Sequence, residues 1–266
     1  MTKHNQKAKQ DLPGLRRWAS KLLALSDEIG NIRYSENDHF GFMALLFLGK
    51  QREHMKSILI LNESPDVVLI ARSMIEGLCQ LLWAAKDPDI LGLQWRVYSF
   101  IQDCQTMQAK IAAGESVDEE SRSRNEEGLR LYGDQFLTRG AREKRDRGDP
   151  LPKDPYRKSW MKYQVRQICE KVKGELLYEH LYRPFSGYHH WDPGGLGTAI
   201  KRDQNWVLYS STSLEYAASA LGVGFQCLLQ TLEVIDRHLE LDIASKIAEL
   251  REGYIAWHQA QRSSKM

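Results

Sequence analysis

The sequence has few cysteines, and their placement excludes two kinds of stabilised small fold. Cys79, Cys104, Cys169 and Cys227 are the only cysteines in 266 residues, and no two of them form a CxxC pair. Such wide spacing argues against a disulfide framework and against a compact zinc site. We therefore expect reduced thiols in the core of a cytoplasmic protein.

An excess of charge of one sign is also missing. Lys and Arg number 37 against 35 Asp and Glu, which gives a formal net charge of +2. This balance argues against a protein that coats nucleic acid through bulk charge, although a local basic patch remains open. The first eleven residues are polar and lack the apolar segment of a signal peptide or anchor. We expect flexible tails at residues 1–11 and 263–266.

The longest apolar run is not free of charge. The nearest candidate, residues 67–85, contains Arg72 and Glu76, and Gln80 follows one turn later. Charged side chains are expensive within a bilayer, so this segment is typical of a buried helix in a soluble protein. We expect no contact with a membrane.

Strand-like alternation is scarce as well, and no internal repeat is present. The chain is long enough for one sizeable core. We predict an all-α protein, with a single multi-helix bundle over residues 12–262 and at most a short extended segment at residues 206–209. The helices expected from apolar periodicity and end signals span residues 15–29, 38–61, 64–86, 91–113, 159–181, 212–238 and 239–261.

Two start signals are the clearest of these. Ser64-Pro65-Asp66 combines a cap, a first-turn proline and a carboxylate at the positive end of the helix dipole. Thr212-Ser-Leu-Glu215 has the spacing of a capping box. The glycine-rich residues 192–197 are expected to form a loop.

Residues 114–158 form a charged insertion in this scheme. Acidic pairs are followed by the basic run Arg139–Arg147 and then by Pro150, Pro152 and Pro155. We interpret the segment as a solvated helical excursion with a mobile loop. The basic run could contact an RNA backbone, but a solvated surface is the commoner outcome for such a run.

Arg72 and Glu76 are the first polar pair of interest. They are four residues apart on an apolar helix, so their side chains are neighbours on one face. Charged groups in such surroundings must be paired. The pair could fix the register of the helix or support a functional site.

The second pair of interest lies in the stretch Arg183-Pro-Phe-Ser-Gly-Tyr-His-His-Trp-Asp192. Ser186 and His190 would share one helical face. A guanidinium can bind a phosphate in its fork, and an imidazole can transfer protons near neutral pH. Arg183 with His190 or His189 would be sufficient for metal-free cleavage of a phosphodiester.

Other interpretations of this stretch remain open. The histidines could cap a helix while Arg183 binds the carbonyl groups that end the preceding one. Glu179 and His180, together with the later histidines and Asp192, could instead bind a metal, but their spacing lacks the H-E-x-x-H signature. Pro184 disfavours a helical backbone at Arg183.

Two separated motifs resemble a known bacterial family. Ala71-Arg72-Ser73-Met-Ile-Glu76, with its Lys86-Asp87-Pro88 stop, and Tyr182-Arg183-x-x-Ser186-x-x-x-His190 are similar to the family catalogued as domain of unknown function 5677. The resemblance extends in order over roughly residues 45–235. It implies an all-helical domain whose characteristic polar residues are Arg72, Glu76, Ser186 and His190.

The spacing of Arg183 and His190, with six residues between them, also resembles the Arg-x(4–6)-His signature of HEPN ribonucleases. That resemblance implies a helical, dimeric and metal-independent endoribonuclease that attacks through the ribose 2′-hydroxyl. It also implies a role in toxin–antitoxin or antiviral systems. In this hypothesis Arg183 and His190 (or His189) are catalytic and face a second copy, while Arg72, Glu76 and Ser186 support them.

Two rival hypotheses belong to other classes. One is a non-catalytic helical interaction or ligand-sensing module, in which the polar residues are structural. The other is a carboxylate–histidine metal hydrolase. For the ribonuclease hypothesis the expected cofactor is none, the expected metal is none, and the expected partners are RNA and a second copy of the chain.

Overall fold

The computed structural model describes residues 3–29, 32, 34–190, 192–196, 200–203, 206–209 and 212–263. Its helices are α1 (Lys3–Glu28), α2 (His39–Leu61), α3 (Val67–Ala84), α4 (Pro88–Val97), α5 (Ser99–Ala112), α6 (Glu119–Tyr132), η1 (Gly133–Phe136), α7 (Arg139–Asp146), α8 (Val165–Lys171), α9 (Glu175–Leu177), the π-helix η2 (Tyr178–Tyr182), α10 (Arg183–His189), α11 (Pro193–Leu196), α12 (Leu214–Leu239) and α13 (Ala244–Ser263). The all-α prediction is confirmed.

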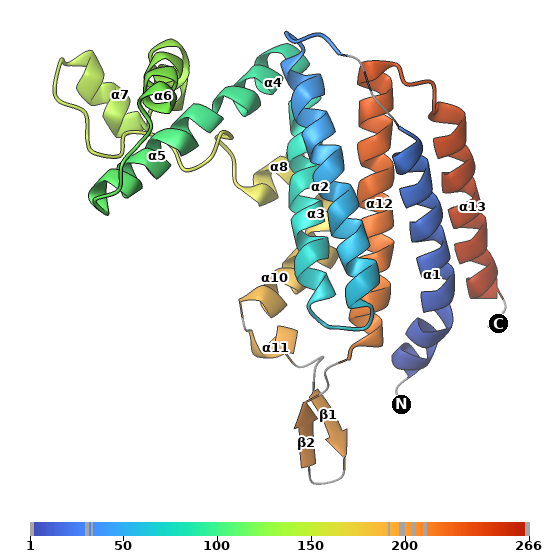
Figure 1. The fold of residues 1–266 in the computed structure, drawn as a ribbon. Coiled ribbons are helices and arrows are strands. Elements are labelled where there is room, and N and C mark those ends of the chain that lie inside the picture. Colours follow the sequence, from blue (N-terminus) through green and yellow to red (C-terminus); the bar gives the residue numbers. More distant parts are fainter. Residues whose placement is uncertain are drawn as a thin grey trace.

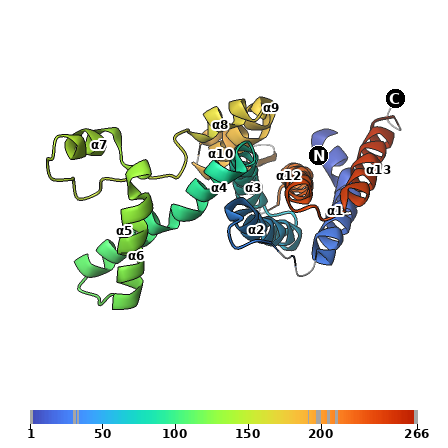
Figure 2. The ribbon, with the colours of Figure 1, turned by 90° about the horizontal axis from the view of Figure 1, so that it is seen from above.

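The long helices α1, α2, α3, α12 and α13 stand side by side (Figure 1). Seen from above, α12 lies between α2 and α3 on one side and α1 and α13 on the other (Figure 2). It packs against α1, α2 and α3 and buries residues from Ala217 to Ile235. Its small residues let these neighbours approach closely.

Two of these helices, α3 and α12, are long and apolar enough to cross a membrane by length and composition alone. Half of the apolar window in α3 and 67% of that in α12 are buried inside the protein. A central core helix passes the same test, so this finding is weak evidence for a membrane span.

The N-terminal helix starts earlier than the sequence analysis indicated. Residues 1–11 were expected to be a polar tail, whereas α1 begins at Lys3. Ala8 and Leu12 are buried and continue the apolar stripe of Leu15 toward the N-terminus. Of the other expected tail, residues 263–266, Ser263 is the last residue of α13 and residues 264–266 lie outside the described part of the chain.

The predicted helix over residues 91–113 is in fact two helices. Asp87 caps α4 by accepting a hydrogen bond from the Ile90 backbone N–H at 3.2 Å, so the helix starts at Pro88. The two helices meet at Tyr98, whose ring is buried against Phe136 and whose hydroxyl donates to the Arg157 carbonyl at 2.8 Å. This anchoring explains why the chain changes direction at Tyr98.

The predicted helix over residues 159–181 is also interrupted. Residues 159–164 are not helical, and this segment instead places Trp160 in the core, where its indole N–H donates to Gln80 at 3.1 Å. α8 ends before Lys173, which has a φ of 60°. A residue in the left-handed region commonly ends a helix.

The other helix boundaries differ from the predicted ones by a few residues. Ser213, rather than Thr212, caps α12, and its hydroxyl accepts from the Tyr216 N–H at 3.3 Å. Glu240 adopts a left-handed conformation that ends α12, so α13 starts only at Ala244. Pro193–Leu196 form the single turn α11 where a loop was predicted.

A two-stranded antiparallel ribbon is the only sheet among the described residues. β1 (Ile200–Asp203) pairs with β2 (Trp206–Tyr209), with Ile200 opposite Tyr209. The ribbon projects from the end of the bundle where α12 begins (Figure 1). It accounts for the predicted extended segment at residues 206–209.

Residues 99–158, which we call the arm, extend sideways from the bundle (Figures 1 and 2). α6 returns along α5, where the Phe100 and Tyr132 rings stack with centroids 6.2 Å apart. The Asn125 side chain donates to the Phe100 carbonyl at 2.7 Å. The excursion predicted for residues 114–158 is therefore largely helical, and α5 already belongs to it.

All four thiols are free, and three of them are buried. The Sγ atoms of Cys79 and Cys169 lie 2.9 Å apart between α3 and α8. Cys227 is a buried residue of α12. Of the four cysteines, only Cys104, on the arm, is partly exposed. Burial raises the pKa of Cys104, and the Asp154 carboxylate adds to this effect.

We predict that a thiol reagent such as DTNB labels one cysteine of the native protein. Thiolate is the reactive form, so the raised pKa of Cys104 should make this labelling slow. All four cysteines should react after denaturation in guanidinium, and mass spectrometry of the native product should place the label on Cys104. Rapid labelling of Cys79, Cys169 or Cys227 in the native protein would contradict this packing.

Candidate functional site

A polar cluster joins α3 to the segment that ends in α10. The Arg72 guanidinium donates through Nε to Ser186 Oγ at 2.9 Å and through Nη2 to the Tyr182 hydroxyl at 2.9 Å. Glu76, one turn along α3, has an oxygen 3.9 Å from Arg72 Nη2. We call these four residues the Arg72 cluster. It connects positions more than a hundred residues apart in the sequence.

Tyr182 is at the centre of this cluster, and the sequence analysis did not select it. Its side chain is buried, and its hydroxyl donates to Glu76 Oε2 at 3.4 Å. Burial raises the pKa of Tyr182; Glu76 raises it further, whereas Arg72 lowers it. The phenol thus remains protonated, accepts from Arg72 and donates to Glu76. One sequence feature could have identified Tyr182 as part of the cluster: it stands four residues before Ser186, so both lie on one helical face.

The Arg72 cluster is half-buried. Side-chain exposure is 21% for Arg72 and 34% for Glu76. The Arg72 guanidinium also lies 4.8 Å from the centroid of the Tyr182 ring, in a cation–π contact. Arg72 is therefore bound to protein groups on several sides, and this arrangement fixes α10 against α3.

Arg183 is helical although Pro184 follows it, contrary to the sequence expectation. Its φ and ψ are −64° and −47°. The π-helix η2 comes immediately before, and the Arg183 N–H donates to the Tyr178 carbonyl five residues earlier. Pro184 cannot donate a backbone hydrogen bond, and its ring clashes with a regular preceding turn. The wider π turn accommodates it, so the helix continues through the proline.

Arg183 lies on the exposed side of α10, and within the described residues none of its side-chain hydrogen bonds reaches the Arg72 cluster. Its side chain is 74% exposed, and its Nη1 lies 3.2 Å from Glu179 Oε2. His189 and His190 are also exposed, and their ring centroids lie 4.8 Å apart. Residues seven apart share a helical face, so Arg183 and His190 lie on one surface with Gly187 between them.

The inner side of α10 is firmly anchored. Phe185 is buried and meets Tyr216 edge to face at 6.3 Å. The Tyr188 hydroxyl donates to Asp66 at 2.9 Å, near the start of α3. Together with the bond between Ser186 and Arg72, these contacts fix the rotation of α10 about its axis. Arg183 and His190 therefore have a defined outward direction.

The six residues selected from the sequence fall into two groups. Arg72, Glu76 and Ser186 come together in the Arg72 cluster, whereas Arg183, His189 and His190 form the exposed surface of α10 and its end. Within the described residues, no side-chain hydrogen bond joins the two groups. The two groups lie on neighbouring faces of one short helix, because Ser186 is three residues from Arg183 and four from His190.

Metal ligands do not converge in the described part of the chain. No group of three His, Cys, Asp or Glu side chains lies close enough together there to bind a metal ion. Glu179 instead pairs with Arg183 and approaches Arg166 at 3.9 Å. The metal-hydrolase hypothesis thus has no ligand set among these residues.

A separate polar contact lies between α3 and α2. The Ser73 hydroxyl and His54 Nε2 are 3.3 Å apart. Burial lowers the pKa of His54, and Lys50 lowers it further, so this imidazole is neutral at pH 7. Ser73 is exposed and belongs to a different side of α3 from the Arg72 cluster. We regard this pair as a link between helices.

Comparison with known protein families gives one match. The profile DUF5677, described as a family of unknown function, matches residues 41–205, well over half of the chain. The matched region runs from α2 to β1 and contains both the Arg72 cluster and the exposed side of α10. No curated protein and no solved structure matches the chain.

Proposed function

The chain belongs to DUF5677, a family of unknown function, and we propose that it is a HEPN-like, metal-independent endoribonuclease. One observation carries this proposal: Arg183 and His190 share the exposed side of an anchored helix. Seven helical residues rise by roughly 10 Å, a span that an arginine side chain and an imidazole can close around one phosphate. Gly187 lies between them, and the Asp192 carboxylate borders this span, with Oδ2 3.5 Å from the place a Cβ on Gly187 would take.

Arg183 would bind the phosphate and stabilise the charge that develops on its oxygens. Its present partner, Glu179, is 40% exposed. Surface ion pairs of this kind contribute about 0–1 kcal/mol. A phosphate can take the place of the Glu179 carboxylate at little cost, and it matches the planar fork of the guanidinium.

The histidines would move the two protons of the reaction. A neutral imidazole takes the proton of the ribose 2′-hydroxyl, and the 2′-oxygen attacks phosphorus. The bond to the 5′-oxygen breaks, and a protonated imidazole gives that oxygen a proton. The products are a 2′,3′-cyclic phosphate and a 5′-hydroxyl. His190 supplies one imidazole, and His189 or the α10 of a second copy supplies the other.

The Arg72 cluster would position α10 without touching RNA. Its hydrogen bonds point from α3 to Tyr182 and Ser186 on the inner side of the helix. A catalytic site gains from rigid support, because small displacements of reacting groups reduce the rate. The homodimer, the cytoplasmic location and the role in toxin or antiviral systems remain predictions.

The decisive experiment incubates purified protein with single-stranded RNA in EDTA. We expect fragments that end in 2′,3′-cyclic phosphate, identified by mass spectrometry. The matched control is the same oligonucleotide with a 2′-deoxyribose at the mapped cleavage site, which should stay intact there. Cleavage that requires added metal, or cleavage at the deoxyribose, would contradict this mechanism.

A non-catalytic interaction module is the second candidate. The observation that favours it is the set of protein partners that already surrounds Arg72. This candidate predicts no RNA cleavage under any buffer condition; self-association is expected of both candidates and does not separate them.

A further inference from the structure

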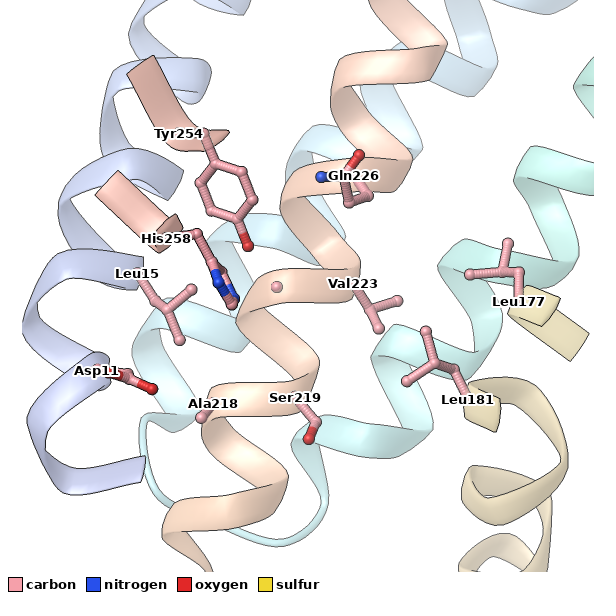
Figure 3. A pocket seen from close by; sticks show the side chains of 11 residues that line it. Asp11, Leu15, Leu177, Leu181, Ala218, Ser219, Val223, Gln226, Tyr254 and His258 are labelled. Atoms are coloured by element: carbon pink, nitrogen blue, oxygen red, sulfur yellow. The ribbon is translucent and has the colours of Figure 1, made fainter. Parts of the chain in front are cut away.

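A groove lies along α12, and neither Arg183 nor His189 or His190 lines it. α1 and α13 form one wall, and α9 and η2 form the other (Figure 3). Its volume is about 350 Å³. Pockets that bind small molecules commonly have volumes of about 300–1,000 Å³, so the groove has room for a small organic ligand.

The two walls of the groove differ in chemistry. Asp11, Tyr254 and His258 extend into it from α1 and α13 (Figure 3). The opposite wall is apolar and consists mainly of Leu177 and Leu181. A ligand that fits both walls has a polar head and an apolar body.

Gly222 keeps the floor of the groove open. It is in the middle of α12, where glycine destabilises a helix relative to alanine. Gly224 has an evident packing role, because a Cβ there would lie 2.7 Å from Met55 Sδ and 3.3 Å from Ile58 Cδ1. A Cβ on Gly222 would meet only the Tyr254 hydroxyl, at an ordinary 3.6 Å. Packing therefore does not require the glycine, whereas an open groove does.

The charge of the polar wall determines which sign of charge a ligand should carry. Asp11 is the only carboxylate among the described residues that line the groove. Tyr254 is buried, and burial raises its pKa, with a further contribution from Asp11. Its hydroxyl thus remains protonated beside a carboxylate. This wall suits a cationic head group that also accepts or donates hydrogen bonds.

We infer that the groove binds a small organic amine, with its ammonium group beside Asp11 and its apolar body against Leu177 and Leu181. This site goes beyond the proposed ribonuclease function and does not depend on it. Asp11 supplies the charge, and the open floor at Gly222 supplies the space.

The test uses two probes with the same ring system and opposite charges. Tryptamine carries an ammonium group at pH 7, and indole-3-propionate carries a carboxylate on a side chain of similar length. By isothermal titration calorimetry we expect tryptamine to bind with a dissociation constant of about 1 mM or lower. Indole-3-propionate should bind at least about tenfold more weakly, because its carboxylate meets Asp11.

Three variants locate the site. Asp11→Asn should weaken tryptamine binding about tenfold or more, since it removes the charge that pairs with the ammonium. Gly222→Leu fills the floor and should abolish binding, whereas Gly222→Ala should fold at least as stably as wild type and bind more weakly. Gly49→Leu is the matched control, because Gly49 is also a helical glycine and a Cβ there meets nothing within 4 Å.

The outcomes separate clearly. Selective binding of tryptamine that Gly222→Leu abolishes and Gly49→Leu retains supports the site. Equal affinity for both probes, unchanged affinity in Asp11→Asn and Gly222→Ala, or no heat of binding up to the solubility limit of tryptamine overturns it. If Gly222→Leu does not fold, as judged by circular dichroism, the affinities of Asp11→Asn and Gly222→Ala for tryptamine decide whether the site exists.

Discussion

Arg72→Ala should lower the free energy of unfolding by about 2–3 kcal/mol, because it removes hydrogen bonds from a charged donor inside the fold. The change leaves the Ser186 hydroxyl without its donor and removes the cation that faces Glu76. It also removes the cation–π contact with Tyr182. For a domain of this size, such a loss corresponds to a melting temperature lower by roughly 5–10 °C. Differential scanning calorimetry measures it.

The matched control for this prediction is Arg183→Ala. Both residues are arginines with a glutamate four residues away in a helical segment, but Arg183 is 74% exposed and Arg72 only 21%. We expect Arg183→Ala to change the free energy of unfolding by less than about 1 kcal/mol. Combining Arg72→Ala with Glu76→Ala should cost less than the sum of the single variants, because the two side chains interact. Equal melting temperatures for Arg72→Ala and Arg183→Ala would refute the role given to the Arg72 cluster.

The bundle was predictable because apolar periodicity alone determines which helices are central. The run from Val67 to Ala84 is apolar nearly all round, and it lies in the core as α3. It was also predictable that Arg72 and Glu76 are paired, since an arginine and a glutamate in such an apolar helix need partners. Their partners could not be identified in the same way, because hydrogen bonds across more than a hundred residues leave no local pattern.

The geometry of α10 was only partly predictable. Pro184 indicated a break in the helix, and a local rule cannot show that a π turn accommodates the proline ring. Tyr182 was quoted in the second family motif but was not selected as a site residue, because one tyrosine in a helical segment is typical of a core residue. Its role depends on α3, which approaches it only in the folded protein.

The splits of the predicted long helices have a similar cause. Periodicity continues from α4 into α5, yet the buried Tyr98 binds the Arg157 carbonyl and redirects the chain. Residues 159–164 have apolar spacing that suits a helix, but Trp160 reaches Gln80 from a non-helical segment. Tertiary contacts outweighed local propensity at both places.

His190→Ala and Arg183→Ala should each reduce RNA cleavage about 100-fold or more if α10 presents the catalytic residues. General acid–base catalysis by a histidine and stabilisation of phosphate charge by an arginine each have this magnitude. His190 is exposed, so His190→Ala should change the melting temperature little. His189→Ala, compared under the same conditions, shows which of the adjacent imidazoles takes part. Initial rates with a fluorogenic RNA in EDTA provide the measurement.

The variants of Arg183 and its partner give the sharpest distinction between a catalytic and a merely structural arginine. Arg183→Lys retains the charge but loses the planar fork, so it should recover only part of the activity lost in Arg183→Ala. Glu179→Gln frees Arg183 from its surface partner, which lies 3.2 Å away. Since phosphate must displace that carboxylate, Glu179→Gln should lower KM and leave kcat unchanged. If Arg183→Ala and Glu179→Gln both leave the cleavage rate unaltered, the surface of α10 does not bind the scissile phosphate.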